Sequence, residues 1–138
     1  MNSEKEYIFK SNVKVRVRYG ETDQMGYCYY GNYAQYFEVG RVEALRELGM
    51  SYKKLEEMGY MLPVSSYGVE YLYPAKYDDL LSIETRVIDL KGVRLYFEYT
   101  ITNASNQIVA TAKTLLVFVN KDTMKPVSPP DSFTNLFQ

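Results

Sequence analysis

The spacing of apolar residues changes along this chain of 138 residues, and that change limits the possible folds. Between residues 33 and 48, apolar side chains recur every three or four positions, as on one face of a helix. Residues 13–19 and most segments after residue 60 instead alternate apolar and polar or form short apolar runs, as strands do. One long helix among strands joined by short turns predicts an α+β fold, with the helix laid on one face of an antiparallel sheet.

The ends of the long helix are also marked in the sequence. Asn32 is a suitable N-cap, and Gly49 suits the left-handed residue that ends many helices. About 17 residues would form a helix of roughly 25 Å. Its small residues, among them Gly40 and Ala44, predict close packing against a flat surface such as a sheet. A second, short helix is expected at residues 52–58.

Five strands are expected, separated by turn-forming residues. They are placed at residues 13–19, 61–73, 80–90, 93–101 and 108–119. Turns are expected at Lys91-Gly92 and at residues 103–107, and three prolines after residue 125 predict an irregular C-terminal tail. The length corresponds to a single domain over residues 1–138.

Composition excludes several classes of function. A net charge of −1 gives no basic surface for nucleic acid, so no nucleic-acid partner is expected. One cysteine and no histidine rule out an intrachain disulfide and ordinary zinc sites, and we expect no metal. No apolar run is long enough for a signal peptide or a membrane span, so we expect a cytoplasmic protein.

The loop before the long helix holds the best candidate catalytic residue. Asp23 lies between Gly20 and Gly31, a few residues before the start of the helix. Backbone N–H groups at a helix start are unpaired and carry the positive end of the helix dipole. Together with a carboxylate they suit chemistry in which negative charge develops on an oxygen. The alternative is that Asp23 is only an Asx-turn residue in a tight loop.

Other polar residues near this loop have competing interpretations. Glu21 is either a second acid in the same site, where a like charge would raise one pKa, or the partner of Arg16 or Arg18. Cys28 has no histidine to activate it, so we interpret it as a small, semi-buried residue and not as a nucleophile. Asp78-Asp79 precedes a strand and is interpreted as a structural turn.

Four segments together resemble the 4-hydroxybenzoyl-CoA thioesterase family, which has the hotdog fold. They are Glu21-Thr22-Asp23-Gln24-Met25-Gly26, Asn32-Tyr33, Glu38-Val39-Gly40-Arg41-Val42-Glu43, and the stretch from Tyr73-Pro74-Ala75 to Ile83-Glu84-Thr85. The similarity covers residues 12–130 and is greatest to Tol-Pal-associated acyl-CoA thioesterases. It implies a five-stranded antiparallel sheet wrapped around one long helix, assembled into homodimers or homotetramers with sites between subunits.

The resemblance also assigns roles to individual residues. It implies an acyl-CoA thioesterase in which Asp23 is the general base or the nucleophile and the backbone N–H of Tyr30, beside Gly31, polarises the thioester. Lys91 and Arg94 would contact the CoA phosphates, although the family often has Ser where Arg94 stands. Lys76 and Lys113 are weaker candidates for this contact. CoA is part of the substrate, and no further cofactor is implied.

Tyr30 differs from the residue that Tol-Pal-type relatives carry. Those relatives have His at this position, whereas the hydroxybenzoyl branch has Tyr. In this chain no imidazole is therefore available to transfer a proton. Tyr33 belongs to a tyrosine cluster that either lines an acyl pocket or packs in the core and dimer interface; the others are Tyr27, Tyr29, Tyr30 and Tyr36.

Three other functions compete with acyl-CoA hydrolysis. Hydratases and dehydratases of this fold use His with an acidic partner, so a chain without His disfavours them. An acyl-carrier-protein thioesterase and a non-catalytic acyl-CoA or acyl-carrier binding module both stay open. Release of free thiol from acyl-CoA would separate a hydrolase from a binding module.

Overall fold

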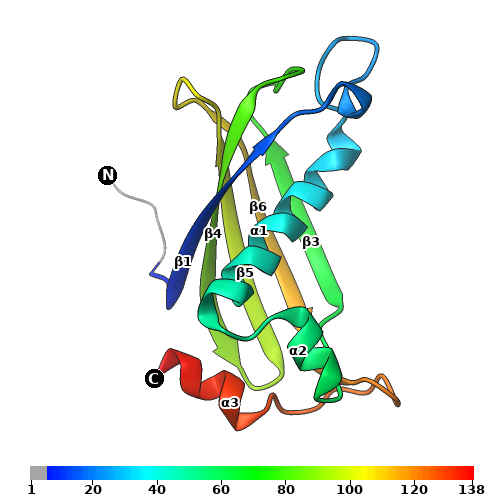
Figure 1. The fold of residues 1–138 in the computed structure, drawn as a ribbon, viewed down its shortest axis with the longest axis vertical. Helices are drawn as coiled ribbons and strands as arrows, with labels where there is room; N and C mark the ends of the chain where they lie inside the picture. Colours follow the sequence, from blue (N-terminus) through cyan, green and yellow to red (C-terminus); the bar gives the residue numbers. More distant parts are fainter. Residues whose placement is uncertain (1–5) are drawn as a thin grey trace.

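The computed structural model describes residues 6–138 and contains a five-stranded antiparallel sheet with a long helix, α1, on one face (Figure 1). This confirms the α+β architecture expected from the sequence. The sheet strands and main helix are β1 (Phe9–Arg16), α1 (Tyr33–Leu48), β3 (Val64–Tyr71), β4 (Leu80–Lys91), β5 (Arg94–Thr102) and β6 (Ile108–Val117). The smaller elements are α2 (Tyr52–Glu57), β2 (Tyr60–Met61), β7 (Val119–Asn120), α3 (Asp131–Thr134) and the 3-10 turns η1 (Tyr19–Glu21), η2 (Tyr30–Asn32) and η3 (Asn135–Phe137).

The order of strands in the sheet is β1-β4-β5-β6-β3, with every neighbouring pair antiparallel. Strands β4, β5 and β6 follow one another through tight turns and form the centre of the sheet. Strands β1 and β3 lie at its two edges. The register pairs Arg16 with Leu80, so the end of β1 lies at the start of β4, and the Lys91 end of β4 lies at the opposite end of the sheet.

Helix α1 packs closely on the sheet, mainly against β1 and β4. A Cβ atom added to Gly40 would lie 2.4 Å from Oγ1 of Thr85 and 3.0 Å from Cγ2 of Ile83, both on β4. No larger side chain fits at that point without a shift of its neighbours, so the small residue predicted to face the sheet does so. The helix ends as expected at Gly49, whose φ of +90° is left-handed and whose N–H bonds back to Arg46.

Several boundaries differ from those expected. Strand β1 runs from Phe9 to Arg16 and not from 13 to 19, because the chain turns into η1 after its last pair with β4. The run expected as one strand from 61 to 73 is divided at Pro63, which has no N–H to donate. Before it, β2 pairs with β7, and after it, β3 pairs with β6.

The C-terminal tail was expected to be irregular, which holds as far as Pro130 but is wrong for the residues that follow. Residues 131–137 form the short helical segments α3 and η3. Phe133 is fully buried, with its ring 5.0 Å from that of Phe118 and 5.4 Å from that of Phe137. The burial of these rings holds the tail against the fold near the turn between β4 and β5 (Figure 1).

Candidate active site

The loop of residues 17–31 leaves the end of β1 and lies beside the segment that precedes β4. The N–H of Val17 donates to the carbonyl of Asp79 at 2.9 Å, and the N–H of Cys28 donates to the carbonyl of Ala75 at 2.7 Å. A bridge between Tyr27 and Lys76 adds a third connection. The loop is therefore fixed at the same end of the sheet as the start of α1.

Asp23 lies where the loop reverses direction. Its Oδ1 accepts the N–H groups of Met25 at 2.9 Å and of Tyr27 at 3.2 Å, while its own N–H donates to the carbonyl of Tyr27 at 2.8 Å. The turn continues through Gly26, whose φ is +82°. The Asx-turn role foreseen for Asp23 is thus present. Its second oxygen, Oδ2, accepts no hydrogen bond from residues 6–138, which leaves it available to another molecule.

The N–H groups of Tyr30 and Gly31 have no acceptor among the described residues. They open η2, the 3-10 turn that leads directly into α1. The expected N-cap, Asn32, is itself helical, and its side chain does not cap the helix. It instead donates from Nδ2 to the carbonyl of Glu21 at 2.8 Å, because the 3-10 turn moves the start of helical backbone ahead of it.

Tyrosine rings from η2, α1 and β3 gather at the start of α1. Tyr33 is buried, whereas Tyr30 keeps 63% of its surface exposed. Tyr71, from edge strand β3, lies 5.1 Å from the Tyr33 ring and 6.3 Å from the Tyr30 ring, and its hydroxyl donates to the Tyr30 carbonyl at 3.3 Å. Tyr71 was not identified from the sequence, since only the sheet order reveals that β3 borders this helix end.

The buried tyrosines stay protonated at neutral pH. Burial is the main cause that raises the pKa of both Tyr33 and Tyr36 above the ordinary tyrosine range. Tyr36 is buried and donates to Oε1 of Glu21 at 2.7 Å. Of the expected tyrosine cluster, Tyr33 and Tyr36 therefore belong to the core, and the loop tyrosines face outward.

Glu21 pairs with Arg18, one of the two partners proposed for it from the sequence. The carboxylate accepts bonds from Nε of Arg18 at 3.2 Å and from Nη2 at 3.0 Å. Arg16 instead contacts Asp78. Burial alone would raise the pKa of the Glu21 carboxyl, but the hydrogen bonds from Arg18 and Tyr36 outweigh burial and hold that pKa below its usual range. Glu21 is therefore a carboxylate at neutral pH.

Cys28 is a buried thiol, as expected. Burial is the main cause that raises its pKa, and no histidine exists in the chain to activate it. Asp79 has the structural role expected for this pair of acids, because its Oδ2 accepts the N–H of Lys76 at 2.9 Å. Asp78 adopts a φ of +72° in the same turn.

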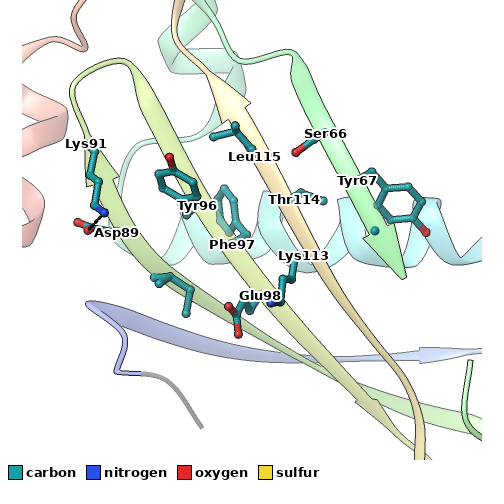
Figure 2. A pocket seen from close by; sticks show the side chains of 12 residues that line it. Ser66, Tyr67, Asp89, Lys91, Tyr96, Phe97, Glu98, Lys113, Thr114 and Leu115 are labelled. Atoms are coloured by element: carbon teal, nitrogen blue, oxygen red, sulfur yellow. Dashed lines mark ion pairs between the residues drawn. The ribbon is translucent and has the colours of Figure 1, made fainter. Parts of the chain in front are cut away.

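Lys91 and Arg94 lie far from Asp23 within one chain. They close the turn between β4 and β5, eleven residues of strand beyond Leu80, which is on the order of 35 Å along the strand. Lys91, Asp89 and Tyr96 line a hollow of about 530 Å³. Figure 2 shows these side chains on the face of the sheet turned away from α1. Lys113 lines the same hollow, whereas Lys76 lies beside the Asp23 loop.

Residues 6–138 contain neither a cluster of metal-binding side chains nor a membrane-spanning helix. No three His, Cys, Asp or Glu side chains converge where they could hold a metal ion. In the same residues, no helix is long and apolar enough to cross a membrane.

A family model described as the thioesterase-like superfamily matches residues 17–137. The chain belongs to this superfamily. It is 36% identical over 124 residues to the acyl-CoA thioester hydrolase YbgC of Escherichia coli, covering 90% of this chain and 92% of that protein. It is 32% identical over 117 residues to YneP of Bacillus subtilis, a putative acyl-CoA thioesterase, covering 85% of each.

The fold is that of solved thioesterases. A DHNA-CoA thioesterase from Staphylococcus aureus superposes with a TM-score of 0.86 at 33% identity, covering 91% of this chain and 85% of that one. The resemblance to hotdog thioesterases drawn from the sequence motifs is thereby confirmed, as is the five-stranded sheet with its long helix.

Proposed function

We propose that this acyl-CoA thioesterase hydrolyses its substrate with the Asp23 carboxylate and the free N–H groups of Tyr30 and Gly31. The observation that carries the proposal is that Asp23, Tyr30 and Gly31 belong to one hydrogen-bonded loop before α1. Asp23 pairs with Tyr27, Thr22 bridges Cys28, and the N–H of Tyr29 bonds to Glu21. This ladder of contacts folds the acid back toward the residues that precede α1.

In the proposed reaction, the two N–H groups bind the thioester carbonyl oxygen. They meet the negative charge that develops there, and the positive end of the α1 dipole adds to this effect. Asp23 then either removes a proton from an attacking water or attacks the carbonyl carbon itself to give a mixed anhydride that water opens. In both routes the C–S bond breaks, the thiolate of CoA leaves and takes up a proton, and the acid is released.

We further propose that the acyl group is a flat aromatic one. Exposed rings of Tyr29 and Tyr30, 4.7 Å apart, and of Tyr71 stand beside the free N–H groups. Aromatic rings favour edge and offset contacts with one another at such separations. The name of the Staphylococcus aureus relative, a DHNA-CoA thioesterase, is consistent with a substrate of this kind.

The proposed active unit is a homodimer formed through β3. This strand is an edge of the sheet, and Val64, Tyr67 and Tyr71 on it are each more than 40% exposed. An exposed edge strand with apolar side chains is a template for pairing. A two-fold axis would pair β3 with its own copy in antiparallel fashion, because the same edge meets itself reversed.

In this proposed dimer, Lys91 and Arg94 of one subunit would lie near the Asp23 loop of the other. Reversal of the second copy brings its β4–β5 turn to the end of the combined sheet where the first copy holds Asp23. The two cations would then meet the phosphates of CoA across the interface, as cations suit phosphate oxygens. A homotetramer would be two such dimers.

The direct test is release of free thiol from acyl-CoA. We expect turnover of aroyl-CoA thioesters, with kcat/KM above that of straight-chain acyl-CoA, and a dimer or larger species by light scattering at micromolar concentration. If no acyl-CoA released a thiol, the proposal of acyl-CoA hydrolysis would be refuted. Release only from acyl-carrier protein would favour the rival substrate, and binding without release would favour a non-catalytic module.

A further inference from the structure

Glu21 forms hydrogen bonds well beyond its ion pair with Arg18, through both its carboxylate and its backbone carbonyl. Its Oε1 accepts the N–H of Arg18 at 2.9 Å and the hydroxyl of Tyr36 at 2.7 Å. Its Oε2 accepts two N–H groups of the Arg18 guanidinium. Its backbone carbonyl accepts the N–H of Tyr29 and Nδ2 of Asn32, both at 2.8 Å. Glu21 therefore joins η1, the later part of the loop and α1.

The bonds to the Glu21 carbonyl lie on either side of the free N–H groups of Tyr30 and Gly31. Tyr29 directly precedes Tyr30, and Asn32 directly follows Gly31, so the carbonyl of Glu21 is bonded on both sides of the pair. Tyr36 lies in the first turn of α1 and connects the Glu21 side chain to the helix. The direction in which the N–H groups point thus depends on the position of Glu21.

Glu21 is not itself placed to do the chemistry. It is only 9% exposed, and both carboxylate oxygens are already bonded within the loop. Asp23 differs in both respects, because it is less buried and its Oδ2 has no partner among residues 6–138. Both acids of the Glu-x-Asp motif therefore bond within the loop, but only Asp23 keeps an oxygen that can also serve the chemistry.

We infer that Glu21, through its bond to Tyr36, is the positioning residue that aligns the N–H groups of Tyr30 and Gly31 and the Asp23 carboxylate for thioester hydrolysis. The inference rests on the proposed function. The Tyr36 hydroxyl also shares a hydrogen bond with the buried thiol of Cys28, at 3.5 Å, so Tyr36→Phe removes this contact as well.

The variant Tyr36→Phe deletes the single hydroxyl that links Glu21 to α1 and keeps the buried ring. We expect kcat to fall on the order of tenfold, the effect of one hydrogen bond to a charged acceptor, while KM changes less than about twofold. Glu21→Ala should lower kcat at least as much. Adding Tyr36→Phe to Glu21→Ala should cause little further loss, because both changes break the same bond. Tyr60→Phe, half-buried against Phe118, is the matched control and should leave kcat unchanged.

Hydrogen exchange separates this inference from the proposed function. Tyr36→Phe should speed amide exchange in residues 19–32 while residues 80–102 exchange as in the wild type, and Tyr60→Phe should not affect that loop. Unchanged loop exchange would overturn the inference even if the wild type hydrolysed no thioester. If the wild type is active and Tyr36→Phe keeps the wild-type kcat, the inference about Glu21 is also overturned, even if the melting temperature of the variant is lower. The proposed function would then stay intact.

Discussion

Replacing Gly40 by alanine tests how closely α1 lies on the sheet. The added methyl would meet Oγ1 of Thr85 at 2.4 Å and Cγ2 of Ile83 at 3.0 Å, and both residues are buried on β4. Overpacking of this kind destabilises by about 1–3 kcal/mol. Alanine opposes that loss by about 1 kcal/mol because it favours helix over glycine. Since two contacts are too short, the cost lies in the upper part of that range, about 2–3 kcal/mol, and we expect a net loss of about 1–2 kcal/mol.

The assay is thermal unfolding followed by circular dichroism. A loss of that size should lower the Tm by roughly 3–8 °C for a domain of this length. In a Thr85→Ala background the shortest contact is gone, so the same substitution should cause a much smaller loss. Gly20→Ala is the control, because a Cβ there meets nothing within 4 Å. A Tm for Gly40→Ala at or above that of the wild type would refute the close packing of helix on sheet.

Three further outcomes concern the loop. Cys28→Ala should lower kcat less than tenfold, because burial raises the pKa of the thiol and a true nucleophile would lose far more. Tyr30→Phe should keep kcat within a few fold at saturating acyl-CoA, whereas a loss of about 10²–10³ would make its hydroxyl an oxyanion donor. Hydrogen bonds hold the pKa of Glu21 below its unfolded value, so its ionised form stabilises the fold at neutral pH and that contribution disappears as pH falls below about 4. The difference in Tm between wild type and Glu21→Gln should therefore shrink on acidification, and a difference that grows would contradict the pKa shift.

The main elements could be predicted because local patterns determine them. The period of three to four residues marks α1, and Gly49 ends it with the left-handed conformation that glycine adopts readily. The turn at Lys91-Gly92 joins β4 and β5 as expected. The helix at 131–134 was missed because four residues are too few to show a helical period, and Phe133 is held by a tertiary contact with Phe118.

The candidate site was only partly predictable for the same reason. Asp23, Tyr30 and Gly31 are close in sequence, so a loop before a helix was enough to group them. Tyr71 comes from an edge strand 41 residues after Tyr30, and only the strand order brings it there. The bond between Glu21 and Tyr36 likewise joins a loop to a helix turn, and no spacing rule in the sequence indicates it.

The measurement that tests the central claim most directly is the kcat of Asp23→Asn with the acyl-CoA that the wild type hydrolyses best. The amide keeps an oxygen that can accept the N–H groups of Met25 and Tyr27, so the loop should fold and the Tm should stay near the wild-type value. We expect kcat to fall by about 10²–10⁴, the contribution of a positioned acid or base, with substrate binding retained. Mass spectrometry must show that the amide is intact. A near-wild-type kcat in that intact variant would show that Asp23 is not the catalytic carboxylate.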